Sequence, residues 1–151
     1  MTGHTTTAPG ATPLDAPYYE APFGEAVSRF WKKYATFSGR ASRSEYWWWH
    51  LVAFIVSAIF NGLAFALGGY GLQLDQSYAP PSAGAVVVFV IWGIWALATI
   101  VPTIAVLARR LHDGNFSAGW ILIGLVPFVG SIVLLVMTLL PPNPEGSRFD
   151  R

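Results

Sequence analysis

Residues 37–52 read FSGRASRSEYWWWHLV, a stretch that passes from charged and hydroxyl side chains to aromatic and aliphatic ones. Ser42 and Glu45 have the S-x-x-E spacing of a capping box, in which each side chain accepts a hydrogen bond from the other residue's backbone amide. Three tryptophans follow at 47–49, and tryptophan gathers at the boundary between lipid headgroups and hydrocarbon. The stretch therefore predicts a helix that begins at a membrane surface and enters the membrane.

The composition of the whole chain is also typical of a membrane protein. Of 151 residues, 54% are hydrophobic and 11% are charged, with a mean hydropathy of +0.47. Soluble domains usually have about a quarter of their residues charged. Cysteine is absent, which excludes disulfide bonds and thiol catalysis.

Three uncharged runs are each long enough to cross a bilayer as a helix: 46–67, 84–108 and 119–140. The sequence therefore predicts an all-α polytopic membrane protein with three transmembrane helices. Pro127 and Gly130 lie inside the third run. We interpret that run as a single kinked span, because two crossings need roughly forty residues; a shallow re-entrant segment is the alternative.

The segments outside these spans complete the domain organisation. Residues 1–22 are rich in Thr, Ala and Pro and predict a disordered tail. Residues 23–37 carry aromatic and aliphatic side chains at helical spacing, with cations on the opposite face, and predict an amphipathic helix. This helix is expected to lie in an anionic lipid interface or to pack on the bundle. A three-span membrane domain then occupies 38–144, and a short polar tail occupies 145–151.

The distribution of cations predicts the orientation. Seven of the nine lysines and arginines precede the first span or close the second, and none lies in the loop between these spans, 68–82. Loops rich in Lys and Arg stay in the cytoplasm. The N-terminus is therefore expected inside and the loop outside, and three crossings would place the C-terminus outside.

The cytoplasmic side carries the candidate binding residues. An Arg-rich rim is expected to bind anionic lipid headgroups or a protein partner, and consists of Arg40, Arg43, Arg109, Arg110 and His112. Three neighbours are expected to serve as helix cap or ion pair: Ser42, Glu45 and Asp113. In particular, we expect Glu45 to pair with Arg109 or Arg110 across the first two spans. The plainer alternative is a short loop whose cations only anchor the chain.

A ladder of small residues on the first span predicts a helix-packing face, formed by Ala58, Gly62 and Ala66 with Asn61 beside it. Small side chains let two helices approach closely. Asn61 is expected to bond a neighbouring helix, and a polar pathway through the membrane is the alternative.

Two motifs in this order resemble a known family. GRASRSEYWW at the first span, followed by RRLHD, a short turn and Gly119-Trp120, resembles the bacterial inner-membrane family called domain of unknown function 805. The resemblance covers about residues 23–149. Its signature positions here would be Gly39, Arg40, Arg43, Glu45, Trp47, Arg109, Arg110, His112 and Asp113. The chain departs from the family pattern at Ala118, which lengthens the turn, and at 146–150, which lack the family's Asn and final Gly.

The resemblance implies a small protein of the bacterial cytoplasmic membrane with no established activity. The sequence holds no nucleophile elbow, Walker loop, HExxH motif or pair of acids within a span, so no catalytic residue, cofactor or metal is expected. We expect a non-enzymatic structural or adaptor component whose partners are membrane lipids, a further copy of itself or another membrane protein, and no nucleic acid. The alternative is a subunit of a small-solute channel or transporter that acts as an oligomer, although His50 is the only ionisable residue in the predicted spans.

Overall fold

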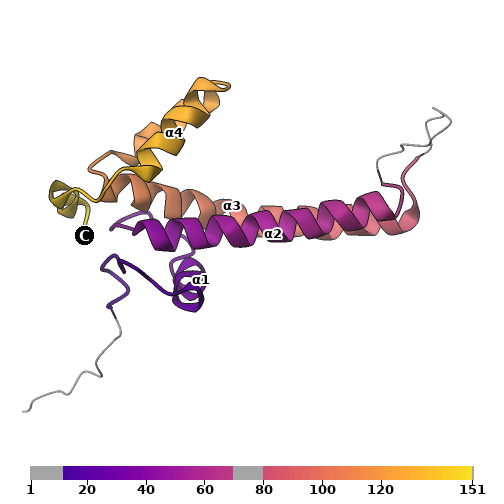
Figure 1. Cartoon of the computed structure of the whole chain (residues 1–151), viewed down its shortest axis with the longest axis horizontal. Helices are drawn as coiled ribbons and strands as arrows, with labels where there is room; N and C mark the ends of the chain where they lie inside the picture. Colours follow the sequence, from indigo (N-terminus) through magenta and orange to yellow (C-terminus); the bar gives the residue numbers. More distant parts are fainter. Residues whose placement is uncertain (1–11, 70–79, 151) are drawn as a thin grey trace, which may run out of the picture.

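The computed structural model describes residues 12–69 and 80–150, and every regular element in these ranges is helical (Figure 1). Four α-helices and two 3₁₀ helices follow one another: α1 (Phe23–Lys32), α2 (Arg43–Ala66), α3 (Ala83–Asp113), η1 (Ala118–Leu125), α4 (Val129–Leu139) and η2 (Pro144–Phe149). The coarse prediction of an all-α membrane protein agrees with this architecture.

The long helices α2 and α3 lie side by side as an antiparallel pair (Figure 1). α2 begins with the predicted capping box, which is confirmed: Ser42 Oγ accepts from the Glu45 amide at 3.2 Å, and Glu45 Oε2 accepts from the Ser42 amide at 2.9 Å. Their 24 and 31 residues make both helices long and apolar enough to cross a bilayer. Most of their aliphatic side chains point outward, as they do in helices that face lipid.

The third apolar run does not form one helix, so the prediction of a single kinked span over 119–140 is wrong. Its first half is η1 and its second half is α4, and the two pack against each other as a short hairpin (Figure 1). The chain reverses at Phe128, whose φ of 60° is left-handed, next to Pro127, which cannot donate a backbone hydrogen bond. Gly130 permits the reversal, because a Cβ atom there would collide with the Ile123 carbonyl oxygen.

The C-terminal segment returns to the end of the bundle where α2 begins. The Asn143 amide donates to the Asp113 carbonyl at 2.7 Å, and the Gly39 amide donates to the Phe149 carbonyl at 2.8 Å. The expected C-terminus on the opposite side depended on a third crossing, and the hairpin removes that basis. Residues 145–150, expected to form only a polar tail, belong mostly to η2.

The N-terminal segment is more ordered than expected. Residues 12–22, part of the predicted disordered tail, pack along the start of α2, and Ala21 is 2% exposed. The rest of that tail, 1–11, lies outside the described residues. α1 ends at Lys32 rather than at residue 37, and Phe30 stacks on Trp49 of α2. This contact supports the alternative in which α1 packs on the bundle.

The predicted ladder on the first span is not the surface that meets α3. Its residues Ala58, Asn61, Gly62 and Ala66 are all exposed, and Asn61 donates to the Ser57 carbonyl of its own helix at 2.8 Å. The buried alanines at this end of the pair are Ala64 and Ala85, both 0% exposed. On α2, the observed packing residue Ala64 therefore lies two positions from the predicted residues Gly62 and Ala66.

Candidate functional site

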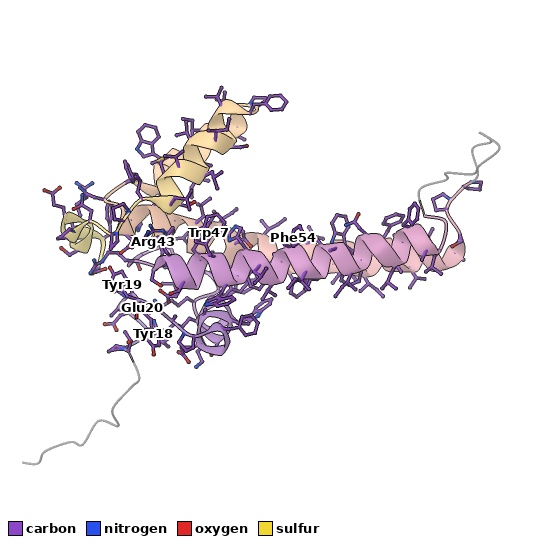
Figure 2. The ribbon with its side chains drawn as sticks, viewed as in Figure 1. Tyr18, Tyr19, Glu20, Arg43, Trp47 and Phe54 are labelled. Atoms are coloured by element: carbon purple, nitrogen blue, oxygen red, sulfur yellow. The ribbon has the colours of Figure 1, made fainter. Side chains whose placement is uncertain are left out.

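Seven charged side chains from several separate segments gather at the end of the bundle where α2 begins and α3 ends. We call this group the charged cap; its members are Arg29, Lys33, Arg40, Glu45, Arg109, Arg110 and Asp113. All except Arg40 have less than 9% of their surface exposed. Figure 2 shows Tyr18 and Tyr19 of the N-terminal segment beside this end of α2, where Arg43 is also labelled. Because buried charges are costly unless they are paired, the contacts of each member decide what the site can do.

Glu45 and Arg29 form the first part of the charged cap. Arg29 Nη1 lies 3.4 Å from Glu45 Oε1, and both side chains are at most 4% exposed. The same guanidinium donates to the backbone carbonyls of Thr12, Pro13 and Ala16. Glu45 also accepts from the Tyr18 amide at 3.2 Å. A single carboxylate thus caps α2, pairs with α1 and holds the N-terminal segment.

Asp113 and Arg110 form the second part, deep in the structure. Arg110 Nη1 donates to Asp113 Oδ2 at 2.5 Å, and both side chains are 0% exposed. Arg110 also donates to the carbonyls of Thr138 and Leu140 at the end of α4, which fixes the hairpin to α3. Tyr19 donates its hydroxyl to Asp113 Oδ1 at 2.7 Å, and burial, followed by this hydrogen bond, raises the pKa of Tyr19 to about 12.

Arg40 and His112 connect the charged cap to the C-terminal segment. Arg40 pairs with Asp150 at 2.7 Å, and the hydrogen bonds to that carboxylate raise the pKa of Arg40 above its ordinary value. His112 is 8% exposed, lies 3.0 Å from the Gly39 carbonyl through Nδ1, and stacks on Phe149 with ring centroids 4.0 Å apart. These contacts tie α3, the loop before α2 and η2 together.

Arg109 differs from the other arginines of the charged cap. It is 2% exposed, yet its side chain makes no hydrogen bond or ion pair with any residue in 12–69 or 80–150, and its Nε and Nη1 atoms are fully enclosed. Lys33 lies within reach of its charge, and the pKa of Lys33 is lowered to about 8. Burial is the main cause of this shift. The charge of Glu45 acts against it, and the charges of Arg109 and Arg29 add to it. Arg109 and Lys33 are therefore two buried cations without a direct partner among the described residues.

The predicted rim residues meet at one end of the molecule, but only Arg43 is exposed. Arg109, Arg110 and His112 are internal, and Arg40 is mostly covered by its pair with Asp150. The expected pairing of Glu45 with Arg109 or Arg110 is also replaced: Glu45 contacts Arg29, and Arg110 contacts Asp113. The buried positions result from the hairpin and the N-terminal segment, which cover surfaces that three separate spans would have left open.

Sequence reasoning missed two members of the charged cap, Arg29 and Lys33, and two residues that bond to the cap, Tyr19 and Asp150. Arg29 and Lys33 were assigned to the polar face of an amphipathic helix. The only local signal was the i, i+4 spacing of Glu25 and Arg29, which form a contact of 3.3 Å. Tyr19 and Asp150 lie in segments that showed no regular pattern, so nothing local indicated their partners.

Within the described ranges, no group of three or more His, Asp or Glu side chains is arranged to hold a metal ion. The acids of the charged cap accept hydrogen bonds from arginines, a tyrosine hydroxyl and backbone amides. The chemistry available here is the binding of charge, by arginine and lysine, in a place largely closed to water.

Comparison with known proteins gives the family. Residues 34–151 match the family described as "Protein of unknown function (DUF805)". The chain is 40% identical over 118 residues to Inner membrane protein YhaI of Escherichia coli (strain K12), covering 78% of this chain and 86% of that protein. It is 35% identical over 118 residues to Inner membrane protein YhaH of the same strain, covering 78% of this chain and 87% of that protein. No solved structure matches the chain. Both relatives are named as inner membrane proteins, and the chain belongs to the DUF805 family of bacterial inner-membrane proteins.

Proposed function

We propose that the protein is a non-enzymatic adaptor of the bacterial inner membrane, in which the charged cap supports a neighbouring cytoplasmic surface that binds anionic lipid. The observation that carries the proposal is the position of Arg43, the exposed rim cation, one residue before Ser44 at the edge of an apolar groove; its Nη1 atom also lies 3.5 Å from the Leu139 carbonyl oxygen. The groove, of about 250 Å³, is lined by Ser44, Trp47, Trp48 and Leu51. An exposed guanidinium next to a groove of this kind suits a lipid whose phosphate meets the cation and whose acyl chain lies against the tryptophans.

Exposed aromatic side chains at this end support the same placement. Phe23 of α1 contacts Trp48 of α2 edge to face, with ring centroids 5.5 Å apart, and both are exposed. Trp31 and Trp47 are exposed as well. Aromatic rings with one apolar and one wet side gather at the headgroup region of a bilayer. The charged cap would therefore sit just inside the cytoplasmic headgroup layer.

The proposed topology has two crossings, α2 and α3, and a half-crossing hairpin formed by η1 and α4. The eleven residues of α4 span about 16 Å at 1.5 Å per residue, roughly half of a hydrocarbon core about 30 Å thick. Both ends of the hairpin then return to the cytoplasmic side, together with η2. In this arrangement the C-terminus lies in the cytoplasm, whereas three crossings would have placed it outside.

Cysteine labelling in intact cells tests the topology. A cysteine in place of Pro81, just before α3, should react with an impermeant thiol reagent, whereas one in place of Ser147 should react only after the cells are opened. Both residues are exposed in the structure, so neither result depends on burial. Labelling at residue 147 in intact cells would restore a third crossing and refute the proposed topology.

The lipid-binding part of the proposal is tested by counting bound phosphatidylglycerol by native mass spectrometry. Arg43→Gln should lower the occupancy of phosphatidylglycerol about fivefold, because a cation near an anionic membrane surface contributes about 1 kcal/mol. Arg43→Lys keeps the charge and is the matched control, which should keep most of the binding. Equal occupancy in Arg43→Gln and the native protein would reject a lipid site at the groove.

The alternative, a channel or transporter subunit, rests on the half-crossing hairpin, because irregular backbone at membrane depth is tolerated where it is buried in protein or lines a cavity. The polar groups Thr99 and Asn61 in the spans bond backbone carbonyls of their own helices, which favours packing over conduction. Flux of ions or small solutes through liposomes that carry the purified protein separates the two functions: flux supports the channel, and tight liposomes support the adaptor.

A further inference from the structure

Arg109 lies on the last turns of α3 with a guanidinium that has lost water without gaining a partner among the described residues. It is 2% exposed, and its Nε and Nη1 atoms are enclosed without an acceptor. By contrast, Arg29 and Arg110, which are buried to the same degree, each bond a carboxylate and backbone carbonyls. Buried guanidinium groups are almost always paired, because desolvation of an unpaired charge is costly. The enclosed donors of Arg109 therefore leave a buried positive charge without a direct partner among the described residues.

The charges around Arg109 show the sign of that acceptor. The charges of Arg109 and Arg29 act on Lys33, that of Arg29 acts on Arg109, and Glu45 is the buried carboxylate that opposes these cations. Arg29 already holds the Glu45 carboxylate in direct contact, so the positive charge of Lys33 and Arg109 is not balanced by a contact within the described residues. An anion is the ligand that would balance it.

Lys33 connects this buried charge to an open pocket. The pocket has a volume of about 440 Å³ and lies between the N-terminal segment and the loop that follows α1. Its polar wall includes Lys32, Lys33, Thr36 and Ser38, which supply ammonium and hydroxyl donors of the kind that bind phosphate. Lys33 is 6% exposed and its ammonium has no partner among the described residues, so its free donors are available to a ligand in the pocket.

Two carboxylates also line the pocket, and they limit the kind of anion that fits. Asp150 is occupied by the guanidinium of Arg40, at 2.7 Å. Asp15 has no such pair within the described ranges, and its charge reaches Lys33. A highly charged polyanion would meet repulsion from Asp15, whereas a single phosphate group, with one or two charges, would face the ammonium groups of Lys32 and Lys33 and one free acid.

We propose that the pocket binds one phosphate group, with Lys33 in contact; Arg109 does not line the pocket and acts on the bound phosphate only through its charge. The phosphate can belong to a phospholipid headgroup or be free in the cytoplasm, because the same donors serve both. The lipid form rests on the proposed function, which places this end of the molecule at headgroup depth; the free form does not. The site is separate from the groove beside Arg43, since the two share no lining residue.

Binding is measured by isothermal titration calorimetry on the full chain in uncharged detergent at pH 7, with two probes. The probes are inorganic phosphate and short-chain dihexanoyl phosphatidylglycerol, and dihexanoyl glycerol serves as the uncharged ligand control. The expected result is saturable binding of at least one phosphate-bearing probe and none of the control. Lys33→Met should weaken binding at least tenfold, Lys33→Arg should retain it, and Arg109→Met should weaken it. If Arg109→Met does not fold, the Lys33 pair still decides.

The two probes identify the source of the phosphate. Binding of both supports a site for the phosphate group itself, binding of the lipid alone supports a headgroup site, and binding of inorganic phosphate alone supports a soluble ligand. Binding of neither probe, or binding that Lys33→Met leaves unchanged, overturns the proposal. Arg43→Gln should leave this binding intact, so failure of the phosphate site and failure of the groove in the proposed function give different patterns.

Discussion

The two ends of the α2–α3 pair are joined by different kinds of contact. At the far end, Ala64 and Ala85 are fully buried, and Ser82 Oγ donates to the Leu67 carbonyl at 2.6 Å. At the near end, the buried side chains include most of the charged cap, and the cap joins α2 and α3 to α1, the hairpin and η2. Small residues let two helices approach but suit many partners, whereas a buried ion pair tolerates few alternatives. The far end therefore provides proximity, and the charged cap determines which segments meet.

The strongest test of this difference is the pair formed by Asp113 and Arg110. Asp113→Asn keeps the size of the side chain but leaves a guanidinium without its charge partner in a fully buried place. Breaking such a pair typically costs about 3–5 kcal/mol. We expect a fall of that size in the free energy of unfolding, measured in mixed detergent and dodecyl sulfate micelles. Asp150→Asn is the control, because its pair with Arg40 is partly exposed and should contribute about 1 kcal/mol or less. Equal losses in both variants would contradict a special role for the buried pair.

The second test uses the pH dependence of the charged cap. Lys33 has a pKa of about 8 in the folded protein against 10.5 for an ordinary lysine, chiefly because of burial. Between these values the unfolded state binds a proton that the folded state has released, so stability must rise as the pH rises from 8 towards 10.5. The gain should reach about 1–3 kcal/mol. Above pH 10, Tyr19, with its raised pKa of about 12, acts in the opposite direction, so the measurement covers pH 7 to 10.

The control for this pH test is Lys33→Met, measured by the same unfolding assay in buffer without phosphate. The substitution removes the titrating group and should flatten the rise between pH 8 and 10. A native-like rise in Lys33→Met would assign the pH dependence to another group.

A substitution in the hairpin should change stability in one direction if the third run is a hairpin and in the other direction if it is a single helical span. Gly130→Ala would drive a Cβ atom into the Ile123 carbonyl oxygen, and we expect a loss of about 1–3 kcal/mol, as for other overpacked sites. In a single helical span the same change would stabilise the helix, since glycine is worse than alanine in a helix by about 1 kcal/mol. Gly62→Ala is the matched control, because nothing lies within 4 Å of its added Cβ atom. Stabilisation by both substitutions, measured by thermal unfolding, would argue for the straight span.

The smallest expected effect is the coupling between Glu45 and its arginine partner. A double-mutant cycle of Glu45→Gln with Arg29→Gln should give an interaction energy of about 0.5–3 kcal/mol, as for other contacting pairs. The same cycle with Arg109→Gln should give less, because the Arg29 guanidinium lies 3.4 Å from the Glu45 carboxylate and Arg109 makes no ion pair with a described residue. A larger coupling with Arg109 would restore the pair that the sequence suggested.

Local signals in the sequence were sufficient for features that depend on neighbouring residues. The capping box at Ser42 and Glu45, the starts of the two long helices and the membrane class all follow from short patterns, and the structure agrees with them. The structure of the third apolar run was harder to predict, because a straight span and a hairpin of the same length have the same hydropathy. The left-handed Phe128 and the close approach at Gly130 distinguish the two, and neither is visible in composition.

Several partners in the charged cap are far apart in the chain, so the spacing of residues in the sequence could not predict these contacts. Asp113 meets Tyr19 across 94 positions of the chain, and Arg40 meets Asp150 across 110. The sequence did indicate that Arg40, Glu45, Arg110 and Asp113 lie in one layer, because helix ends on one side of a bundle must be close. Which carboxylate serves which arginine depends on how the N-terminal segment and the hairpin fold over the layer.

The hydrogen bond from the Gly39 amide to the Phe149 carbonyl, at 2.8 Å, has a consequence for biosynthesis. Two residues so far apart in the chain cannot meet until the later one has left the ribosome, and contacts of such long range form late in folding. The two long helices can therefore insert into the bilayer while His112 and Asp113 at the end of α3 are still accessible to water and to the translocation machinery. Closure of residues 143–150 over the end of α3, where Asn143 bonds Asp113 and Phe149 stacks on His112, is the step that converts inserted helices into the finished protein, and a bulky fusion joined at residue 151 would act on that step.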